Sequence, residues 1–178
     1  IGDWGVTAAD VVADLRAIGN KPIDLHINSE GGSVFDGLAI YNALANHPKP
    51  ITAYVDALAA SAASFIAMAA SHIVIAKNAS MMIHDALGFA VGNAADMRAL
   101  ADLLDESSQT IAEIYNDRSD KGVEHWRDLM RAESWFRGQA AVDAGLADEV
   151  AQPRQRNEAV PGITNEAPNP TGAHTPAP

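Results

Sequence analysis

The sequence predicts an α/β fold with a mostly parallel sheet. Apolar residues switch repeatedly between the spacing of an amphipathic helix and the every-second spacing of a strand. Strands that alternate with helices in this way usually pair in parallel. Hydrophobic residues make up 48% of the chain but aromatic residues only 6%. Much of the apolar share is alanine, which favours close helix packing over large aromatic clusters.

The first half of the chain contains five predicted elements. Thr7 is a suitable N-cap for the first helix, which Gly19 ends. The next segment alternates Ile23, Leu25 and Ile27, which indicates a strand. The predicted order is a helix over 7–19, a strand over 22–29, a helix over 33–47, a strand over 50–58 and a small-residue helix over 61–71.

The second half begins with two short strands over 72–76 and 80–87, separated by a turn at Lys77 and Asn78. A long helix is predicted from Asn93 to about Ser119. Its apolar stripe consists of Leu100, Leu103, Leu104, Ile111, Ile114 and Tyr115.

The domain boundary is expected near Val150. Residues 151–178 hold six of the nine prolines and almost no bulky apolar side chain. Such a segment buries too little surface to offset its ordering entropy, so a disordered tail or linker is expected. Residues 1–150 form the expected globular domain. Its abrupt start suggests that a first strand is missing.

Composition excludes several functions. The net charge is −11, which opposes nucleic-acid binding because phosphates require a basic face. Cysteine is absent, so disulfides and thiolate metal sites are excluded. No apolar run is long enough to span a membrane, and no signal peptide begins the sequence. A soluble, intracellular protein is therefore expected.

Chemistry in such folds is expected at the carboxyl ends of strands. The first candidate is Gly31–Gly32, where a strand gives way to a helix. Glycines allow close approach of the backbone, and amides at a helix N-terminus suit an anion or a developing oxyanion. A tight strand-to-helix turn is the structural alternative.

Ser61 is the second candidate, because it lies where the strand over 50–58 should meet the next helix. A nucleophile there would benefit from the helix dipole and from the Ala62 amide. An N-cap role is the structural alternative. Ser64 and Ser71 are expected to be small packing residues that bond back to preceding carbonyls, and Ser64→Ala is expected to be neutral or slightly stabilising.

His84 is the candidate general base, because it ends a strand and precedes a loop. A structural histidine is the alternative. The other five histidines lie within strands, next to helices or in the tail. Spacing does not choose the acid that would orient His84 among the 23 carboxylates.

Four stretches resemble the Clp protease proteolytic subunit (ClpP) family in order and spacing. They are INSEGGSVFDGLAIYNAL, AASAASFIAMAAS, MMIHDALGFAVGNAADM and ESWFRGQAAVDAGLADEV. The resemblance implies the ClpP/crotonase-like spiral of ββα units with a protruding handle helix. It also implies Ser61 as nucleophile, His84 as base, Glu133 as acid, Gly32 and Ala62 as oxyanion donors and Gly31 as the supporting turn. No metal or cofactor is expected.

Three departures from the family pattern favour the ClpP-like head maturation proteases of phages and prophages. Glu133 stands where aspartate is usual, and Glu30 replaces a proline. Ala57-Leu58 replaces Gly-Gln, and Ala62 replaces a methionine. The resemblance implies peptide or protein substrates, including capsid or scaffold proteins, in the cytoplasm or inside the procapsid. It also implies a homo-oligomeric ring or stacked rings.

Three alternatives remain open at this point. A crotonase-type acyl-CoA enzyme would use similar backbone amides without a Ser-His pair. A catalytically inactive protein of the same fold would serve in capsid assembly. A Ser-Lys dyad would have to use Lys77, and His84 makes that dyad unnecessary.

Overall fold

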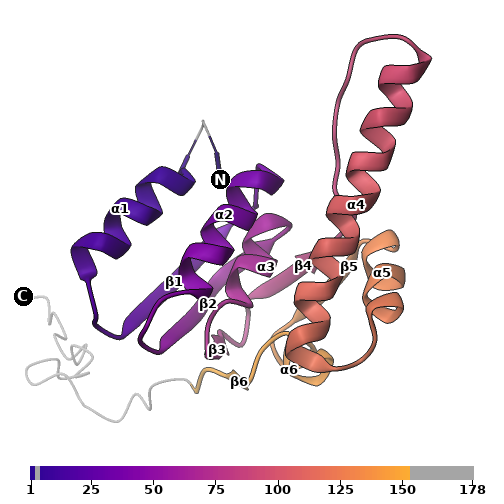
Figure 1. Ribbon diagram of the computed structural model, residues 1–178. Coiled ribbons are helices and arrows are strands. Elements are labelled where there is room, and N and C mark those ends of the chain that lie inside the picture. Colours follow the sequence, from indigo (N-terminus) through magenta and orange to yellow (C-terminus); the bar gives the residue numbers. More distant parts are fainter. Residues whose placement is uncertain (3–4, 153–178) are drawn as a thin grey trace, which may run out of the picture.

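The predicted α/β fold is confirmed by the computed structural model, which describes residues 1–2 and 5–152 (Figure 1). The elements are α1 (Ala8–Ile18), β1 (Ile23–Ser29), α2 (Val34–Ala45), β2 (Ile51–Ala60), α3 (Ala62–Ala67), β3 (His72–Ile75), β4 (Ser80–Ile83), α4 (Ala94–Ser119), α5 (Val123–Arg131), β5 (Ser134–Arg137), α6 (Gln139–Ala144) and β6 (Glu149–Val150). The predicted tail lies outside the described residues from residue 153 onward.

The sheet is organised around β2, its longest strand. β1 pairs in parallel along one edge of β2. The other edge is shared, because β3 pairs with residues 52–55 and β4 with residues 58–60. β6 adds to β3 in parallel, and only β5 is antiparallel, against β4. Along this edge, β3 therefore pairs with the first half of β2 and β4 with its last residues. The carboxyl ends of β2 and β4 lie side by side.

The structure differs from the expected elements near the site. The strand expected over 80–87 ends at Ile83, so His84 lies just beyond it. β5, α6 and β6 lie in a stretch for which no element was predicted. They are short, and short elements carry too few residues to establish a period.

Capping boxes fix the starts of two of the predicted helices, α1 and α4. The Thr7 side chain accepts from the Asp10 amide, and Asp10 reciprocates in a capping box. Asn93 and Asp96 form the same arrangement at the start of α4. Each box satisfies amide groups that the helix itself leaves unpaired.

The core lies where β2, β3 and β4 meet α3 and α4. Ala53, Ile73, Ile75, Met81 and Ile83 on these strands have no exposed surface. α4 and α5 contribute larger side chains to the same cluster, among them Tyr115, Trp126 and Met130.

The outer half of α4 extends beyond this body, and residues 86–92, which lead outward to the start of the helix, run beside it (Figure 1). Gly88 lies between Leu100 and Leu104 of the helix, because a Cβ atom there would fall 3.1 Å and 3.2 Å from their methyl groups. We call the outer half of α4 together with residues 86–92 the arm. Among the described residues, no helix is both long enough and apolar enough to cross a membrane.

Candidate active site

Ser61 and His84 are neighbours at the carboxyl ends of β2 and β4. The two strands pair in parallel through Ala60 and Met82, and the Ser61 amide donates to the Met82 carbonyl at 2.9 Å. His84 Nε2 lies 2.8 Å from Ser61 Oγ. That distance allows the imidazole to accept the serine proton. The structure therefore brings together the nucleophile and base predicted from the sequence.

The backbone of Ser61 argues against the N-cap alternative. Its side chain makes no capping hydrogen bond to the helix that follows. Its backbone angles, φ 53° and ψ −124°, lie outside the regions that residues other than glycine ordinarily adopt. A non-glycine residue in such a conformation costs on the order of 1–3 kcal/mol. The surrounding structure holds that strain, and the hydroxyl is aimed at His84 instead of the helix.

Gly31 provides the space that Ser61 occupies. With φ of 100°, a Cβ atom on Gly31 would fall 2.7 Å from both the Ala60 oxygen and the Ser61 Cβ, and 2.9 Å from the Ala62 nitrogen. Only glycine fits this close approach. Gly31–Gly32 is therefore more than a turn between β1 and α2, because it packs directly on the backbone of the nucleophile.

Gly32 is fixed by the chain on its other side. A Cβ atom there would fall 2.1 Å from the Ile1 oxygen. The nitrogen of Ile1 donates to the Gly31 carbonyl at 2.7 Å. Peptide planes are trans, so the Gly32 amide of the same plane points away from Ile1.

Ser64 corrects one of our expectations. Its hydroxyl donates to the Ser61 carbonyl at 2.5 Å, as expected. However, it is fully buried and also lies 2.8 Å from the Tyr115 hydroxyl, 51 positions away in the sequence. Ser64→Ala would leave a buried tyrosine hydroxyl without its partner, so we expect a loss of stability in place of the neutral effect expected from helix propensity. Ser71 bonds to the Ile51 carbonyl across the sheet, not to the preceding turn.

Glu133 lies in the turn that precedes β5, just outside the sheet register. β4 and β5 are antiparallel, and their last pair is Ile83 with Ser134. His84 and Glu133 are the next residues outward on each chain. The carboxylate of Glu133 accepts only a long hydrogen bond, 3.5 Å from Trp135 Nε1. Glu133 also has a positive φ of 49°, a feature it shares with Ser61.

Asp85, the alternative acid, has another partner. Arg127 Nη1 donates to Asp85 Oδ1 at 2.7 Å. The arginine is only 5% exposed, and its second amine lies 3.4 Å from Asp105. Leaving this buried guanidinium unpaired would be costly. Asp85 therefore neutralises Arg127.

The segment that follows His84 is held from both helices beside it. α5 supplies Arg127 for Asp85, and α4 supplies Ser108, whose hydroxyl accepts from the Ala86 amide at 2.9 Å. Sequence analysis missed Ser108, Arg127 and the Tyr115 hydroxyl as contributors. Each acts across more than twenty positions, and no local pattern marks such contacts.

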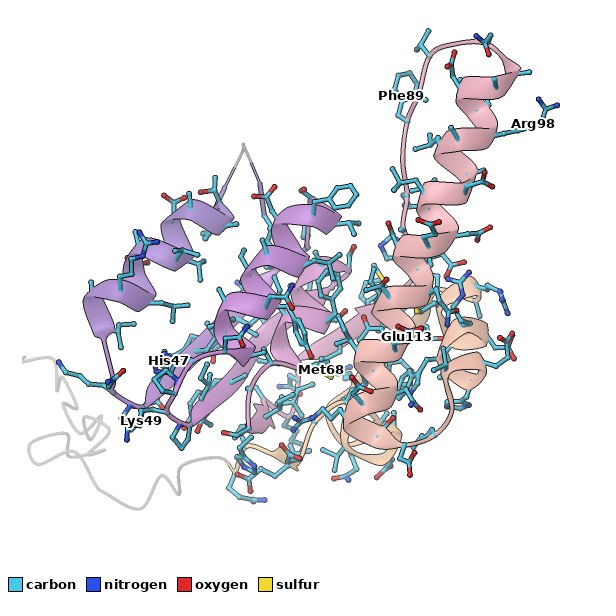
Figure 2. The ribbon with its side chains drawn as sticks, viewed as in Figure 1. His47, Lys49, Met68, Phe89, Arg98 and Glu113 are labelled. Atoms are coloured by element: carbon cyan, nitrogen blue, oxygen red, sulfur yellow. The ribbon has the colours of Figure 1, made fainter. Side chains whose placement is uncertain are left out.

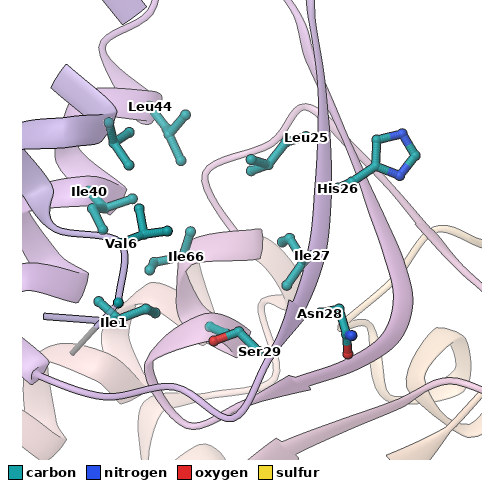
Figure 3. Close-up of a pocket in the computed structure, with 13 residues that line it drawn as sticks. Ile1, Val6, Leu25, His26, Ile27, Asn28, Ser29, Ile40, Leu44 and Ile66 are labelled. Carbon is teal, nitrogen blue, oxygen red and sulfur yellow. The ribbon is translucent and has the colours of Figure 1, made fainter. Parts of the chain in front are cut away.

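An apolar cavity of about 350 Å³ lies apart from the Ser61–His84 pair (Figure 3). Leu25 and Ile27 of β1, with Ile40 and Leu44 of α2, form much of its wall. His26 and Ser29 also line it, but neither Ser61 nor His84 does, so the strand ends remain the candidate site. Within residues 1–2 and 5–152, no three histidine or carboxylate side chains are grouped to hold a metal ion.

A parallel α/β spiral with a Ser-His pair at its strand ends is typical of a serine hydrolase. The family model for Clp protease matches residues 6–154. The chain is also 31% identical over 134 residues to the ATP-dependent Clp protease proteolytic subunit 1 of Leifsonia xyli subsp. xyli (strain CTCB07). That match covers 74% of this chain and 68% of the relative. The chain belongs to the Clp protease family and is a serine peptidase of that family.

Proposed function

We propose that this protein is an endopeptidase in which Ser61, His84 and Glu133 act as a catalytic triad. The observation that carries the proposal is the 2.8 Å contact between Ser61 Oγ and His84 Nε2 at adjoining strand ends. The family resemblance supports Glu133 as the acid, as does its position one residue beyond the last β4–β5 pair, which His84 shares on the other strand. The Ser-His pair and the family match both favour peptide hydrolysis over acyl-CoA chemistry.

The reaction follows from this geometry. Ser61 Oγ attacks the peptide carbonyl carbon while its proton passes to His84 Nε2. The imidazolium then gives that proton to the departing amine, and the acyl group stays on Ser61. Water, deprotonated by His84, attacks the ester and releases the second product. Glu133 would hold the imidazole tautomer and stabilise its charged form.

Two backbone amides would hold the tetrahedral oxyanion. The Gly32 amide belongs to a peptide plane whose carbonyl is bound by Ile1, so it points away from that residue. The Ala62 amide is the first of α3 and has no partner within the helix. Each such donor is worth roughly 3 kcal/mol of transition-state stabilisation in well-studied hydrolases.

Labelling with a fluorophosphonate tests the catalytic assignment. We expect one adduct by intact mass, mapped to Ser61, and its loss in both Ser61→Ala and His84→Ala. Ser71→Ala is the control, because its hydroxyl is bonded to the Ile51 carbonyl and faces no base. A folded protein that never labels would indicate the inactive assembly protein instead, and labelling that persists in Ser61→Ala would place the nucleophile at another residue.

The family implies protein substrates and an oligomer, and we propose a homo-oligomeric ring that encloses the active sites. The head-maturation branch is a finer proposal that rests on the departures at Glu30, Ala57–Leu58, Ala62 and Glu133. Cleavage of a phage scaffold or capsid precursor at a defined site, without an ATPase, would support it. Digestion of unfolded proteins only together with an ATPase would contradict it. The head-maturation role places the enzyme in the cytoplasm of an infected or lysogenic cell, or inside the procapsid.

A further inference from the structure

We propose that Tyr115 and Ser64 are positioning residues that orient and polarise the oxyanion-binding amide of Ala62. The inference rests on the proposed function and deepens it. It starts from two linked hydrogen bonds between α4 and the nucleophile. The buried one joins Tyr115 and Ser64 at 2.8 Å, and the part-buried one runs from Ser64 to the Ser61 carbonyl at 2.5 Å.

The direction of this chain is fixed by the donors available. The Ser61 carbonyl can only accept, so the single Ser64 proton must go to it. Ser64 Oγ can then only accept from Tyr115, whose hydroxyl is the donor. The order is Tyr115 to Ser64 to the Ser61 carbonyl. Because the chain has one direction, each hydrogen bond strengthens the next.

The Ser61 carbonyl and the Ala62 amide are the two ends of one peptide plane. Peptide groups are rigid, so a carbonyl held by Ser64 also fixes where the Ala62 N–H points. Drawing electron density towards that carbonyl makes the N–H a stronger donor. The hydrogen bond that Ser64 makes to the Ser61 carbonyl would therefore strengthen the hydrogen bond from the Ala62 amide to an oxyanion.

Ser61 has particular need of this support. Its positive φ is strained, and α3, which begins at the next residue, is only six residues long. Its carbonyl accepts from the Ser64 amide at 2.9 Å as well as from the hydroxyl. Removing the Ser64 hydroxyl would leave the Ser61–Ala62 peptide plane held only by the longer hydrogen bond from the Ser64 amide.

Tyr115 is itself firmly held. It is 1% exposed on α4, and its ring centroid lies 5.3 Å from that of Trp126. Burial raises the pKa of the Tyr115 hydroxyl, and the hydrogen bond with Ser64 lowers it by less. The hydroxyl therefore stays protonated throughout the working range, and the effect should not alter the shape of the pH–rate profile.

The test compares Tyr115→Phe, Ser64→Ala and the double variant by steady-state cleavage of a fluorogenic peptide, with kcat expressed per labelled Ser61. We expect Tyr115→Phe to lower kcat roughly tenfold and Ser64→Ala roughly a hundredfold, with KM within twofold. The double variant should be no slower than Ser64→Ala, because Tyr115 acts through Ser64. Inhibition by a peptide aldehyde, which forms an oxyanion on Ser61, should weaken in proportion.

Ser119→Ala is the matched control. Ser119 lies one turn beyond Tyr115. Its hydroxyl donates to the Tyr115 carbonyl at 2.9 Å and accepts from Trp126 Nε1 at 2.8 Å, so its loss breaks part-buried hydrogen bonds of α4 while leaving the Tyr115 hydroxyl in place. Its kcat per labelled site should stay at the wild-type value. Equal effects in the control and in Tyr115→Phe, or additive losses in the double variant, would overturn the inference.

A second readout does not depend on turnover. In protein labelled with ¹⁵N-alanine, the Ala62 amide proton should move to higher field in Tyr115→Phe and stay in place in Ser119→Ala. An unmoved Ala62 resonance would overturn the relay even if the enzyme is active. Labelling that survives Ser61→Ala would overturn the proposed function instead.

Discussion

Gly31 lies in contact with Ser61, so closely that a Cβ atom on the glycine would fall 2.7 Å from the Cβ of the serine. Gly31→Ala should therefore displace the nucleophile and destabilise the fold by about 3 kcal/mol or more, the sum of backbone strain and overpacking. Thermal unfolding and peptidase assays would measure both effects.

Gly19 is the matched control for this change. It also has a positive φ, 64°, but a Cβ atom there meets nothing within 4 Å. Gly19→Ala should cost about 1–3 kcal/mol from backbone strain alone and leave activity intact. If Gly31→Ala cost no more than Gly19→Ala, the contact with Ser61 would be unimportant.

Replacing Ser61 separates chemistry from stability. Ser61→Ala should abolish hydrolysis and lower the free energy of unfolding by less than about 1 kcal/mol, since one partly buried hydrogen bond is lost. Ser61→Gly should be equally inactive but more stable than Ser61→Ala, by roughly 1 kcal/mol, because glycine tolerates the strained backbone. Circular dichroism melts compare the three proteins. A more stable alanine variant would mean that the positive φ carries no strain.

Ser61 and His84, whose side chains are in contact, were both candidates from the sequence alone. Both lie at strand ends, where the catalytic groups of parallel sheets are usually found. Ser61 and His84 are each adjacent to an element with a clear period. Glu133 was reached only through resemblance, since it precedes β5, which is too short to show a pattern. Tyr115 was recognised as part of an apolar stripe, but its hydroxyl partner depends on how α4 crosses α3. Such crossings are fixed by packing, which local propensity does not encode.

Glu133 and Asp85 should respond in opposite ways to loss of charge. Glu133→Gln should lower kcat by orders of magnitude with little change in melting temperature, because the carboxylate has no strong structural partner. Glu133→Asp should keep substantial activity if the backbone shifts by one methylene. Measuring kcat and the melting temperature of both variants against the unaltered protein tests this prediction.

Asp85→Asn is the counterpart. It removes the carboxylate charge beside the buried Arg127 and leaves the exposed Asp105, 3.4 Å away, as its anionic partner, so we expect a loss of about 3 kcal/mol in stability. Activity should fall chiefly with the folded fraction. Normal turnover by Glu133→Gln, together with an inactive but folded Asp85→Asn, would make Asp85 the acid.

The arm is the surface on which we expect assembly to depend. Leu87, Phe89 and Val91 are 77%, 89% and 86% exposed on the segment of the arm that leads to α4. Phe89 and Arg98 project in different directions from its outer part (Figure 2). Three exposed apolar side chains at every second position form a continuous apolar edge, which is typical of a contact surface.

Phe89→Glu should therefore reduce the oligomer to smaller species at micromolar concentration, because a carboxylate placed in an apolar contact is left without a partner. Phe35→Glu is the control, since Phe35 is 61% exposed in the first turn of α2, outside the arm. Sedimentation velocity distinguishes the proteins. If the unaltered chain sediments only as an 18.7 kDa species, the proposed ring is wrong. If Phe89→Glu assembles as fully as Phe35→Glu, subunits must meet through another surface.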